Sequence, residues 1–334
     1  MIWNNVELFN VSEICPVDDG IRIYRFPKRV RDAFENSNHP YSIEVGQMTT
    51  GCEIRFVGEG ADITLTALDN SGTVDIFRGD FLSKTVHLPV GTPTKIELRG
   101  DVMVDKVDLS CYKGVVDTAV FRVVFNHDYR AMINSVEPVG EVRPPRACEI
   151  PEKRILAYGS SITHGAGAGP FTNSYIYNVG RLTGAEVLCK GMGGSCFIQP
   201  EVADYIATEG FDIAIFELGI NMVSDFPVEV FRERAEYLIK STLALGKPVV
   251  LISNYVSYYN IESSPYYEKN KAYVKCLEEL YEKYSCDTLY YIRGDEMLDS
   301  FGYLTADVLH PSPFGHAEMS RKIANKLKGE FKLL

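Results

Sequence analysis

"LAYGSSITHGAGAG", from Leu156 to Gly169, is a short apolar run that stops at two adjacent serines and continues into three spaced glycines. A dinucleotide-binding loop does not explain it, because that fingerprint needs a glycine where Pro170 stands. A Walker loop does not explain it either, since the Gly-Lys-Ser/Thr ending is missing. The G-x-S-x-G elbow also fails, because Thr163 stands at its second glycine. We interpret the stretch as a strand-to-helix turn that presents a serine in a different layout.

The chain beyond this stretch alternates short apolar runs with segments of helical spacing. The apolar runs are "RILAYG", "EVLCKG", "DIAIFELG", "PVVLISN" and "TLYYIRG". The segments between them include "SYIYNVGRLTG", "PVEVFRERAEYLIKSTLALG" and "SPYYEKNKAYVKCLEELYEKY". This alternation predicts right-handed crossovers and a three-layer, flavodoxin-like α/β domain with a mostly parallel sheet. Ligands of such sheets bind beyond the carboxyl ends of the strands.

The first part of the chain has a different pattern. From about Gly51 to Leu98, apolar and polar residues alternate in short runs separated by turn-forming residues such as Gly58-Glu59-Gly60. Period-two runs at this spacing predict antiparallel strands, and we expect an all-β, jelly-roll-like sandwich. Further strands are expected at "KVDLSCY" and "TAVFRVVF", and "RVRDAFEN" is the one helix expected before about Arg130.

Prolines mark the change between the two patterns. Four of them lie in "VEPVGEVRPPRACEIPEK", residues 136–153, and are expected to interrupt any regular element. The predicted organisation is a β-sandwich domain at 1–135, a Pro-containing linker at 136–153 and an α/β domain at 154–334.

The composition restricts the classes of partner. The 334-residue chain has a formal net charge of -11 and no long Lys/Arg run, which argues against nucleic-acid binding. "MIWNNVELFN" lacks the basic start and apolar core of a signal peptide, and no window reaches membrane-spanning length. The eight cysteines show no CxxC spacing, so we expect reduced thiols in a cytoplasm rather than disulfides or a zinc site.

Groups suited to nucleophilic catalysis follow several of the predicted strands. A serine nucleophile needs a base, a group that fixes the tautomer of that base, and donors for the developing oxyanion. Ser161 follows the first apolar run, and "GMGGSC" (191–196) brings backbone amides after the second. Asn221 in "ELGINM" follows the third, while Asp307 and His310 lie three residues apart in "DVLHPSPFGH".

Taken in this order, the four segments resemble the blocks of the SGNH, or GDSL-like, hydrolase family. Gly159-Ser160-Ser161-Ile162 is similar to the first block, Gly-Asp-Ser-Ile/Leu, and this similarity implies that Ser161 is the nucleophile. The terminal Asp-x-x-His block implies Asp307 and His310 as the other catalytic residues. The resemblance extends from about Arg154 to Leu327.

The resemblance also implies an oxyanion hole. "GMGGSC" matches the glycine block with Gly194 as the best match and Gly193 as the close alternative, and "GIN" matches the Gly-x-Asn block. Two positions depart from the family, since Ser160 and Met222 replace aspartates of the first and third blocks. Neither belongs to the catalytic set, so activity is not excluded. The implied donors are the backbone amides of Ser161 and Gly194 and the side-chain amide of Asn221.

The "GSSIT" form with an N-terminal β-domain is similar to a subgroup that includes carbohydrate O-deacetylases and an acyltransferase-like branch. The resemblance implies a serine esterase that hydrolyses short acyl O-esters, above all acetyl esters, of a carbohydrate or similar small molecule through an acyl-enzyme. No metal or organic cofactor is needed. The alternatives are an acyltransferase with the same residues and a decayed, glycan-binding protein. No nucleic-acid or membrane partner is expected, and oligomerisation is left open.

Other residues near these blocks have simpler explanations. We expect His164 to be a solvated loop histidine and Cys196 to be a small buried residue rather than a second nucleophile. Tyr175 and the aromatic segment "NYVSYYN" (Asn254 to Asn260) could line a sugar or acyl site, but packing is the expected role of aromatic residues at strand ends.

Overall fold

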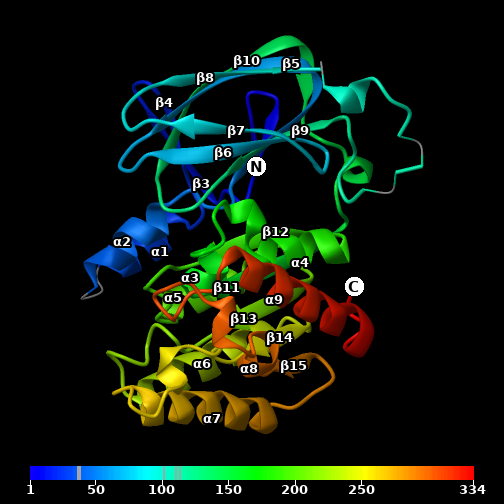
Figure 1. Cartoon of the computed structure of the whole chain (residues 1–334). Coiled ribbons are helices and arrows are strands. Elements are labelled where there is room, and N and C mark those ends of the chain that lie inside the picture. The colour runs from blue at the N-terminus through cyan, green and yellow to red at the C-terminus, as the bar shows by residue number, and fades with distance from the viewer. Residues whose placement is uncertain (36–38, 101, 110, 113) are drawn as a thin grey trace. The chain divides into compact units, whose positions relative to one another are not determined.

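The computed structural model describes the whole chain except residues 36–38, 101, 110 and 113. The chain forms two compact units (Figure 1). The first comprises Met1–Lys28, Gly46–Glu152 and Pro170–Thr172, and the second comprises Arg29–Val45, Lys153–Gly169 and Asn173–Leu334. The second unit therefore contains a segment, Arg29–Val45, from the N-terminal part of the sequence.

The first unit is an antiparallel β structure. Its strands in the described part of the chain are β1 Ile2–Trp3, β2 Val6–Phe9, β3 Glu13–Val17, β4 Gly20–Tyr24, β5 Glu53–Ala67, β6 Gly72–Arg78, β7 Phe81–Leu88, β8 Thr94–Arg99, β9 Val120–Phe125 and β10 Ala131–Arg143. The long strand β5 belongs to two groups of strands. Its first residues pair with β2 and β9, and its later residues pair with β8 and β10.

The two groups enclose one apolar core, as a sandwich requires. Side chains from β2, β6 and β9 in one group and from β4, β8 and β10 in the other belong to the same buried cluster. β5 continues through Gly58-Glu59-Gly60, where the sequence pattern indicates a turn between two strands. Glycine within a strand often marks a tight bend, and here it lies where β5 passes from one group to the other.

Two sequence expectations for the first part of the chain are wrong. "KVDLSCY" does not form a strand in its described residues, and Ser110 lies outside them. Val107 and Tyr112 are exposed, so the alternating pattern of this segment does not create a buried face. The expected helix at 29–36 corresponds to α1 Lys28–Glu35, with Asn36 outside the described residues, but α2 Pro40–Gln47 was not expected.

The proline-rich segment is more regular than its composition indicates. β10 continues through Pro138 to Arg143, well into the predicted linker. It pairs with β4 only at Met132 and Ile133, so beyond that point no strand of the described residues pairs with this edge of β10. A proline, which has no N–H to donate, is tolerated on an edge of this kind.

The second unit has a five-stranded parallel sheet in the order β12-β11-β13-β14-β15. The strands are β11 Lys153–Gly159, β12 Ala185–Gly191, β13 Ile213–Glu217, β14 Val249–Ile252 and β15 Leu289–Ile292. The helices after the nucleophile segment are α3 Ser161–His164, α4 Tyr175–Thr183, α5 Pro200–Ile206, α6 Val228–Leu243, α7 Tyr267–Lys283, α8 Gly294–Met297 and α9 Pro313–Asn325. This is the flavodoxin-like order, so the predicted α/β fold is confirmed.

The sequence explains this sheet directly. All residues of β13 and β14 are buried and all but Glu217, the last residue of β13, are apolar, as is typical of a parallel sheet covered on both faces. From β11 the chain moves across the sheet to β12 in one direction, and from there on to β15 in the opposite direction. Because the crossover connections are right-handed, α4 lies on one face of the sheet, and the opposite face is covered by α5, α6 and α7. The direction reverses between β11 and β13, where ligands of such folds bind.

Candidate active site

Ser161, His310 and Asp307 form a continuous hydrogen-bonded chain. Ser161 Oγ lies 2.7 Å from His310 Nε2, although the two residues are 149 positions apart in sequence. His310 Nδ1 lies 2.6 Å from Asp307 Oδ2. Ser161 follows β11, and the other two residues lie on the loop that leads into α9. The fold therefore brings together the three residues that the sequence suggested as nucleophile, base and orienting acid.

The surroundings of Asp307 keep it ionised. Its Oδ1 accepts hydrogen bonds from Thr305 Oγ1 at 2.7 Å and from the amides of Leu309 and His310 at 2.9 and 3.0 Å. Partial burial raises the pKa of Asp307, but the hydrogen bonds from His310, Thr305 and Leu309 outweigh it and hold the pKa well below its usual range. An ionised Oδ2 can only accept, so His310 carries its proton on Nδ1 and its Nε2 accepts from the Ser161 hydroxyl.

The loop holds this geometry with a strained backbone. Val308, between the aspartate and the histidine, has a φ of 57°. A β-branched residue rarely adopts this left-handed conformation, because its Cβ crowds the following backbone. The turn lets one carboxylate accept from two successive amides and from the imidazole. Strain of this kind persists where the surrounding contacts impose it, as they do at many functional sites.

The turn that carries Ser161 is capped by its neighbour. Ser160 is the N-cap of α3, and its Oγ accepts a hydrogen bond from Ile162 N at 3.2 Å. Ser161 thus occupies the first helical position, where a backbone N–H has no partner within the helix. The Ser160 hydroxyl and amide both donate to Glu217 at the end of β13, at 2.6 and 2.7 Å.

The glycine loop and Asn221 lie beside this turn. Met192 N donates to Gly159 O at 2.8 Å, which ties the loop to the end of β11. A Cβ added to Gly193 would lie 3.9 Å from Ser161 Cβ, whereas Gly194 has a φ of 63° and faces the ring of Tyr41. Cys196 N donates to Asn221 Oδ1 at 3.2 Å, which fixes the orientation of that amide. With the amide oxygen of Asn221 occupied in this way, Nδ2 is the donor side of its amide.

Gly167 couples the nucleophile loop to the histidine loop, and this contact supports a first prediction. Its φ is 85°, and an added Cβ would lie 2.1 Å from Pro311 O, next to His310. We expect Gly167→Ala to displace His310 and to lower kcat about 10-fold to 100-fold, since misplacing a catalytic group by about 1 Å can cost 100-fold. Steady-state kinetics on an ester would measure the loss.

Gly169→Ala is the matched control. Its φ is 81°, but an added Cβ finds no atom of the described residues within 4 Å. Both variants carry the backbone strain of a left-handed alanine, and only Gly167→Ala clashes. Equal kinetic losses in the two variants would show that the contact with Pro311 is unimportant.

The remaining sequence candidates are mostly structural. His164 is 2% exposed, so the expectation of a solvated loop histidine is wrong; its helix packs against β12. Cys196 is buried as expected, and burial with the nearby Glu217 raises the pKa of its thiol, which disfavours the nucleophilic thiolate. Tyr175 and Tyr255 are also buried, so neither ring is available to a ligand.

Tyr41 is a site neighbour that the sequence did not indicate. It lies on α2, and two atoms of its ring would be 3.1 and 3.3 Å from a Cβ on Gly194. Its exposed fraction is 51%, although His39 before it packs on Phe197 and Phe226 with ring centroids 4.4 and 5.5 Å apart. The α2 segment is therefore anchored on the α/β unit and presents an accessible aromatic ring at the glycine loop.

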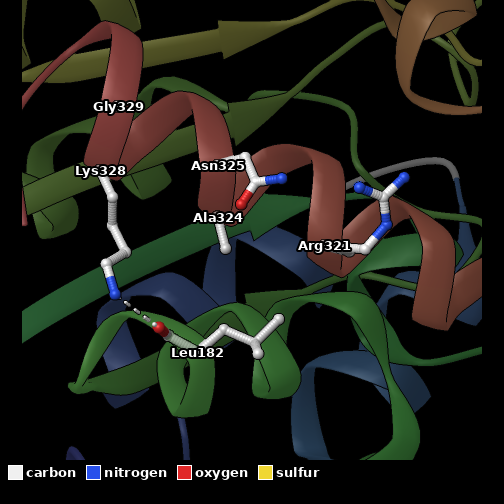
Figure 2. Close-up of a pocket in the computed structure, with 6 residues that line it drawn as sticks. All are labelled: Leu182, Arg321, Ala324, Asn325, Lys328 and Gly329. Carbon is white, nitrogen blue, oxygen red and sulfur yellow. Dashed lines mark hydrogen bonds between the residues drawn. The ribbon is translucent and has the colours of Figure 1, made fainter.

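A hollow elsewhere on this unit lacks the groups for this chemistry. Figure 2 shows it between the end of α4 and α9, with Lys328 Nζ donating to Leu182 O at 3.3 Å. Arg321, which also lines it, is paired with Glu318 at 2.7 Å. Neither the serine nor the histidine described above contributes to its lining, which comprises Leu182, Arg321, Ala324, Asn325, Lys328 and Gly329. The hydrogen-bonded chain at Ser161 is therefore the candidate active site.

The described residues contain neither a cluster suited to a metal ion nor a helix suited to a membrane. No group of three His, Cys, Asp or Glu side chains there is arranged to hold a metal ion. No helix in the same residues is both long and apolar enough to cross a membrane.

The part of the chain that contains this site matches a known family. The sequence model of the GDSL-like lipase/acylhydrolase family matches residues 152–328, which is just over half of the chain. None of the curated proteins is similar enough in sequence to match. The matched range contains every residue of the hydrogen-bonded chain and of the glycine loop.

Solved structures are similar over nearly the whole chain, including the β unit. The salicylyl-acyltransferase SsfX3 from a tetracycline biosynthetic pathway has a TM-score of 0.78 at 15% identity, over 96% of this chain and 93% of that one. A family two carbohydrate esterase from Cellvibrio japonicus has a TM-score of 0.67 at 13% identity, over 98% and 96%. Another, from Clostridium thermocellum in complex with cellohexaose, has a TM-score of 0.65 at 12% identity, over 86% and 95%. At these identities the likeness shows a shared fold.

Proposed function

Because this chain belongs to the GDSL-like lipase/acylhydrolase family, we propose that it is a serine esterase that removes a short acyl group, in particular acetyl, from a carbohydrate. The observation that carries the proposal is the hydrogen-bonded chain from Ser161 through His310 to Asp307, at 2.7 and 2.6 Å. A hydroxyl with a base at this distance, and a base held by an ionised carboxylate, is the arrangement that activates a serine.

The proposed reaction has two acyl transfers. His310 Nε2 removes the Ser161 proton as Oγ attacks the ester carbonyl, and Asp307 stabilises the imidazolium that forms. The tetrahedral intermediate collapses as His310 returns the proton to the leaving alcohol, and an acyl-serine remains. Water then attacks the acyl-serine by the same route and releases the acid.

Backbone and side-chain amides are the proposed oxyanion donors. They are Ser161 N at the start of α3, Gly194 N on the glycine loop and Asn221 Nδ2, whose orientation is fixed by the bond from Cys196 N. Each donor of this kind contributes about 100-fold to 1000-fold to turnover. Since the chemistry is acid–base and nucleophilic, it proceeds without a metal or organic cofactor.

A sugar as the leaving alcohol is supported by Tyr41. An accessible aromatic ring beside the oxyanion donors can stack on the apolar face of a pyranose, as aromatic rings do on flat apolar surfaces. The fold is also shared with carbohydrate esterases, one of them solved with cellohexaose bound.

Product analysis on two kinds of substrate tests the proposal. p-Nitrophenyl acetate, butyrate and octanoate report ester turnover and acyl length, and peracetylated cello- and xylo-oligosaccharides report the sugar. We expect free acetate as the product, with acetyl preferred over octanoyl. Transfer of the acyl group to an added alcohol in place of water would identify an acyltransferase, and glycan binding that survives Ser161→Ala without turnover would identify a binding protein.

A substitution at Tyr41 distinguishes recognition of the sugar from recognition of the acyl group. We expect Tyr41→Ala to raise KM about 10-fold for an acetylated oligosaccharide, which corresponds to one lost aromatic contact. Tyr41→Phe keeps the ring and is expected to keep KM. p-Nitrophenyl acetate has no pyranose, so its KM is expected to change little.

Tyr237→Ala is the control for this variant. Tyr237 is 43% exposed and lies on α6 of the same unit, where its hydroxyl donates to Asp204 at 2.6 Å. Its loss is expected to leave both KM values unchanged. Equal KM values for wild type and Tyr41→Ala on the oligosaccharide would remove Tyr41 from the sugar site.

A further inference from the structure

Glu217 is a buried carboxylate directly behind the nucleophile. It is the last residue of β13 and is 1% exposed. Its Oε2 accepts three hydrogen bonds, from Ser160 Oγ at 2.6 Å, Ser160 N at 2.7 Å and Thr163 Oγ1 at 3.2 Å. All three donors belong to the turn and first helical residues that flank Ser161.

These contacts favour the ionised form of Glu217. A proton on Oε2 would displace one of the three donors, because that oxygen already accepts from all of them. A proton on Oε1 would be buried without an acceptor, since Oε1 has no hydrogen-bond partner among the described residues. The geometry therefore suits a carboxylate, even though a buried charge without a cationic partner is costly.

The hydrogen bond from Ser160 to Glu217 links this carboxylate to the turn that carries Ser161. Because the Ser160 hydroxyl donates its proton to Glu217, its oxygen lone pairs face Ile162 N, which donates to them at 3.2 Å. That cap starts α3 and so sets the direction of the Ser161 amide and hydroxyl. The first block of this chain has a serine where the family has an aspartate, and the turn obtains a carboxylate from β13 instead.

We propose that Glu217 is a positioning residue for the esterase reaction, whose ionised carboxylate holds Ser161 in its reactive geometry through Ser160 and Thr163. The inference rests on the proposed function, because it concerns the same nucleophile. It adds a second ionisation to the activity, separate from that of His310.

The surroundings of Glu217 set the pH at which this ionisation occurs. Burial raises the pKa of Glu217 to about 7, against the opposing effect of the hydrogen bonds from Ser160 and Thr163. The titratable groups that interact with it from neighbouring elements are Tyr175 on α4, Tyr255 after β14 and Cys196 on the glycine loop. Burial raises the pKa of each of these, so they are neutral near pH 7. Glu217 is then the member of this group that changes charge near neutral pH.

The pH profile of kcat/KM on p-nitrophenyl acetate is the decisive measurement. If both His310 and Glu217 must lose a proton, the acid side of log(kcat/KM) against pH is expected to reach a slope of about 2 in wild type. In Glu217→Gln the slope is expected to fall to about 1, and kcat to drop about 10-fold to 100-fold with little change in KM. Glu217→Asp keeps the charge and is expected to keep the steeper slope.

A double-mutant cycle tests the route of the effect. Ser160→Ala removes the hydroxyl that links Glu217 to the turn. If Glu217 acts through Ser160, the double variant is expected to lose less than the product of the two single losses. Multiplicative losses would mean that the two residues act independently.

The stability of the variant gives a readout of a different kind. A carboxyl group whose pKa is higher in the folded than in the unfolded state binds its proton more tightly when folded. Relative to an uncharged residue, it contributes its full stabilisation of the fold below the unfolded pKa of about 4.5. This stabilisation is lost as the pH rises through the folded pKa of about 7. The Tm of Glu217→Gln relative to wild type is therefore expected to increase from pH 5 to pH 8. A structural role without positioning would lower Tm and kcat together at every pH.

Glu186→Gln is the matched control. Glu186 is also buried in the sheet, on β12, but it pairs with Arg154 at 2.9 Å at the other end of the strands. This variant is expected to change stability and to leave kcat and the slope unchanged. If the Glu217→Gln variant keeps the turnover and the pH profile of wild type, the inference about Glu217 is overturned and the proposed function stands. If wild type itself turns over no ester, both the inference and the proposed function are overturned.

Discussion

Ser161→Ala is expected to lower ester turnover by about 10⁴-fold to 10⁶-fold, which is the usual loss when a serine nucleophile is removed. Ser160 and Cys196, two nucleophilic side chains near Ser161, are not suited to take over the attack. Ser160 lies next in sequence, but it is 1% exposed and its hydroxyl is held by Glu217 at 2.6 Å. Cys196 is buried with a raised thiol pKa. The small activity that remains would come from the oxyanion donors and substrate binding alone.

Kinetics and covalent labelling together test the prediction for Ser161→Ala. Turnover of p-nitrophenyl acetate gives the loss, and mass spectrometry after reaction with a fluorophosphonate gives the labelled residue. Wild type is expected to gain one label at Ser161 and the alanine variant none. Ser285→Ala, an exposed serine beyond α7, is the control for the substitution itself and is expected to behave as wild type. Labelling that persists in Ser161→Ala would assign the nucleophile to another residue.

The α/β unit could be predicted from the sequence because its signals are local. The strands of the parallel sheet are short and mostly apolar, and the central strand β14 Val249–Ile252 is buried throughout and reads as an uninterrupted apolar run. The polar residues that end these runs are brought to one edge by the parallel order alone. Ser161 and Asn221 therefore lie near each other for a reason that needs no knowledge of side-chain packing.

The β unit was less predictable because its decisive contacts are not local. β5 crosses between two groups of strands at Gly58-Glu59-Gly60. When the paired strands are unknown, this short sequence indicates a turn instead of a continuous strand. "KVDLSCY" alternates like a strand, but none of its described residues pairs as a strand. Pro138 is tolerated within a strand, since in the described part of the chain one edge of β10 has no partner strand there. In each case tertiary pairing overrode the local pattern.

The two site residues that the sequence did not indicate differ in kind. Glu217 left a signal, because the single charged residue in the buried run "IAIFELG" must find partners. That signal shows that the carboxylate has a role, although not that its partners flank the nucleophile. Tyr41 left no signal, since an aromatic residue on a short helix is ordinary, and only the anchoring of α2 by His39 brings it to the glycine loop.

Asp307→Asn is expected to lower kcat about 10⁴-fold while leaving the fold intact. The Oδ1 of Asp307 accepts from Thr305 and from the amides of Leu309 and His310, and the amide oxygen of asparagine can replace it at the same position. The asparagine Nδ2 then lies where Oδ2 was, 2.6 Å from His310 Nδ1 in wild type, and it can only donate. His310 is forced to carry its proton on Nε2, so it cannot accept the proton of Ser161.

The tautomer gives this prediction a direct readout. Proton NMR of wild type is expected to show a downfield Nδ1–H resonance from the bond between His310 and Asp307, and the asparagine variant is expected to lose it. Asp18→Asn, at an exposed position after β3, is the control and is expected to keep both the resonance and kcat. Because the amide oxygen of asparagine keeps the hydrogen bonds of Oδ1, the unfolding temperature of Asp307→Asn is expected to stay near that of wild type. A variant that loses the resonance but keeps its turnover would show that His310 does not need Asp307 to act as the base.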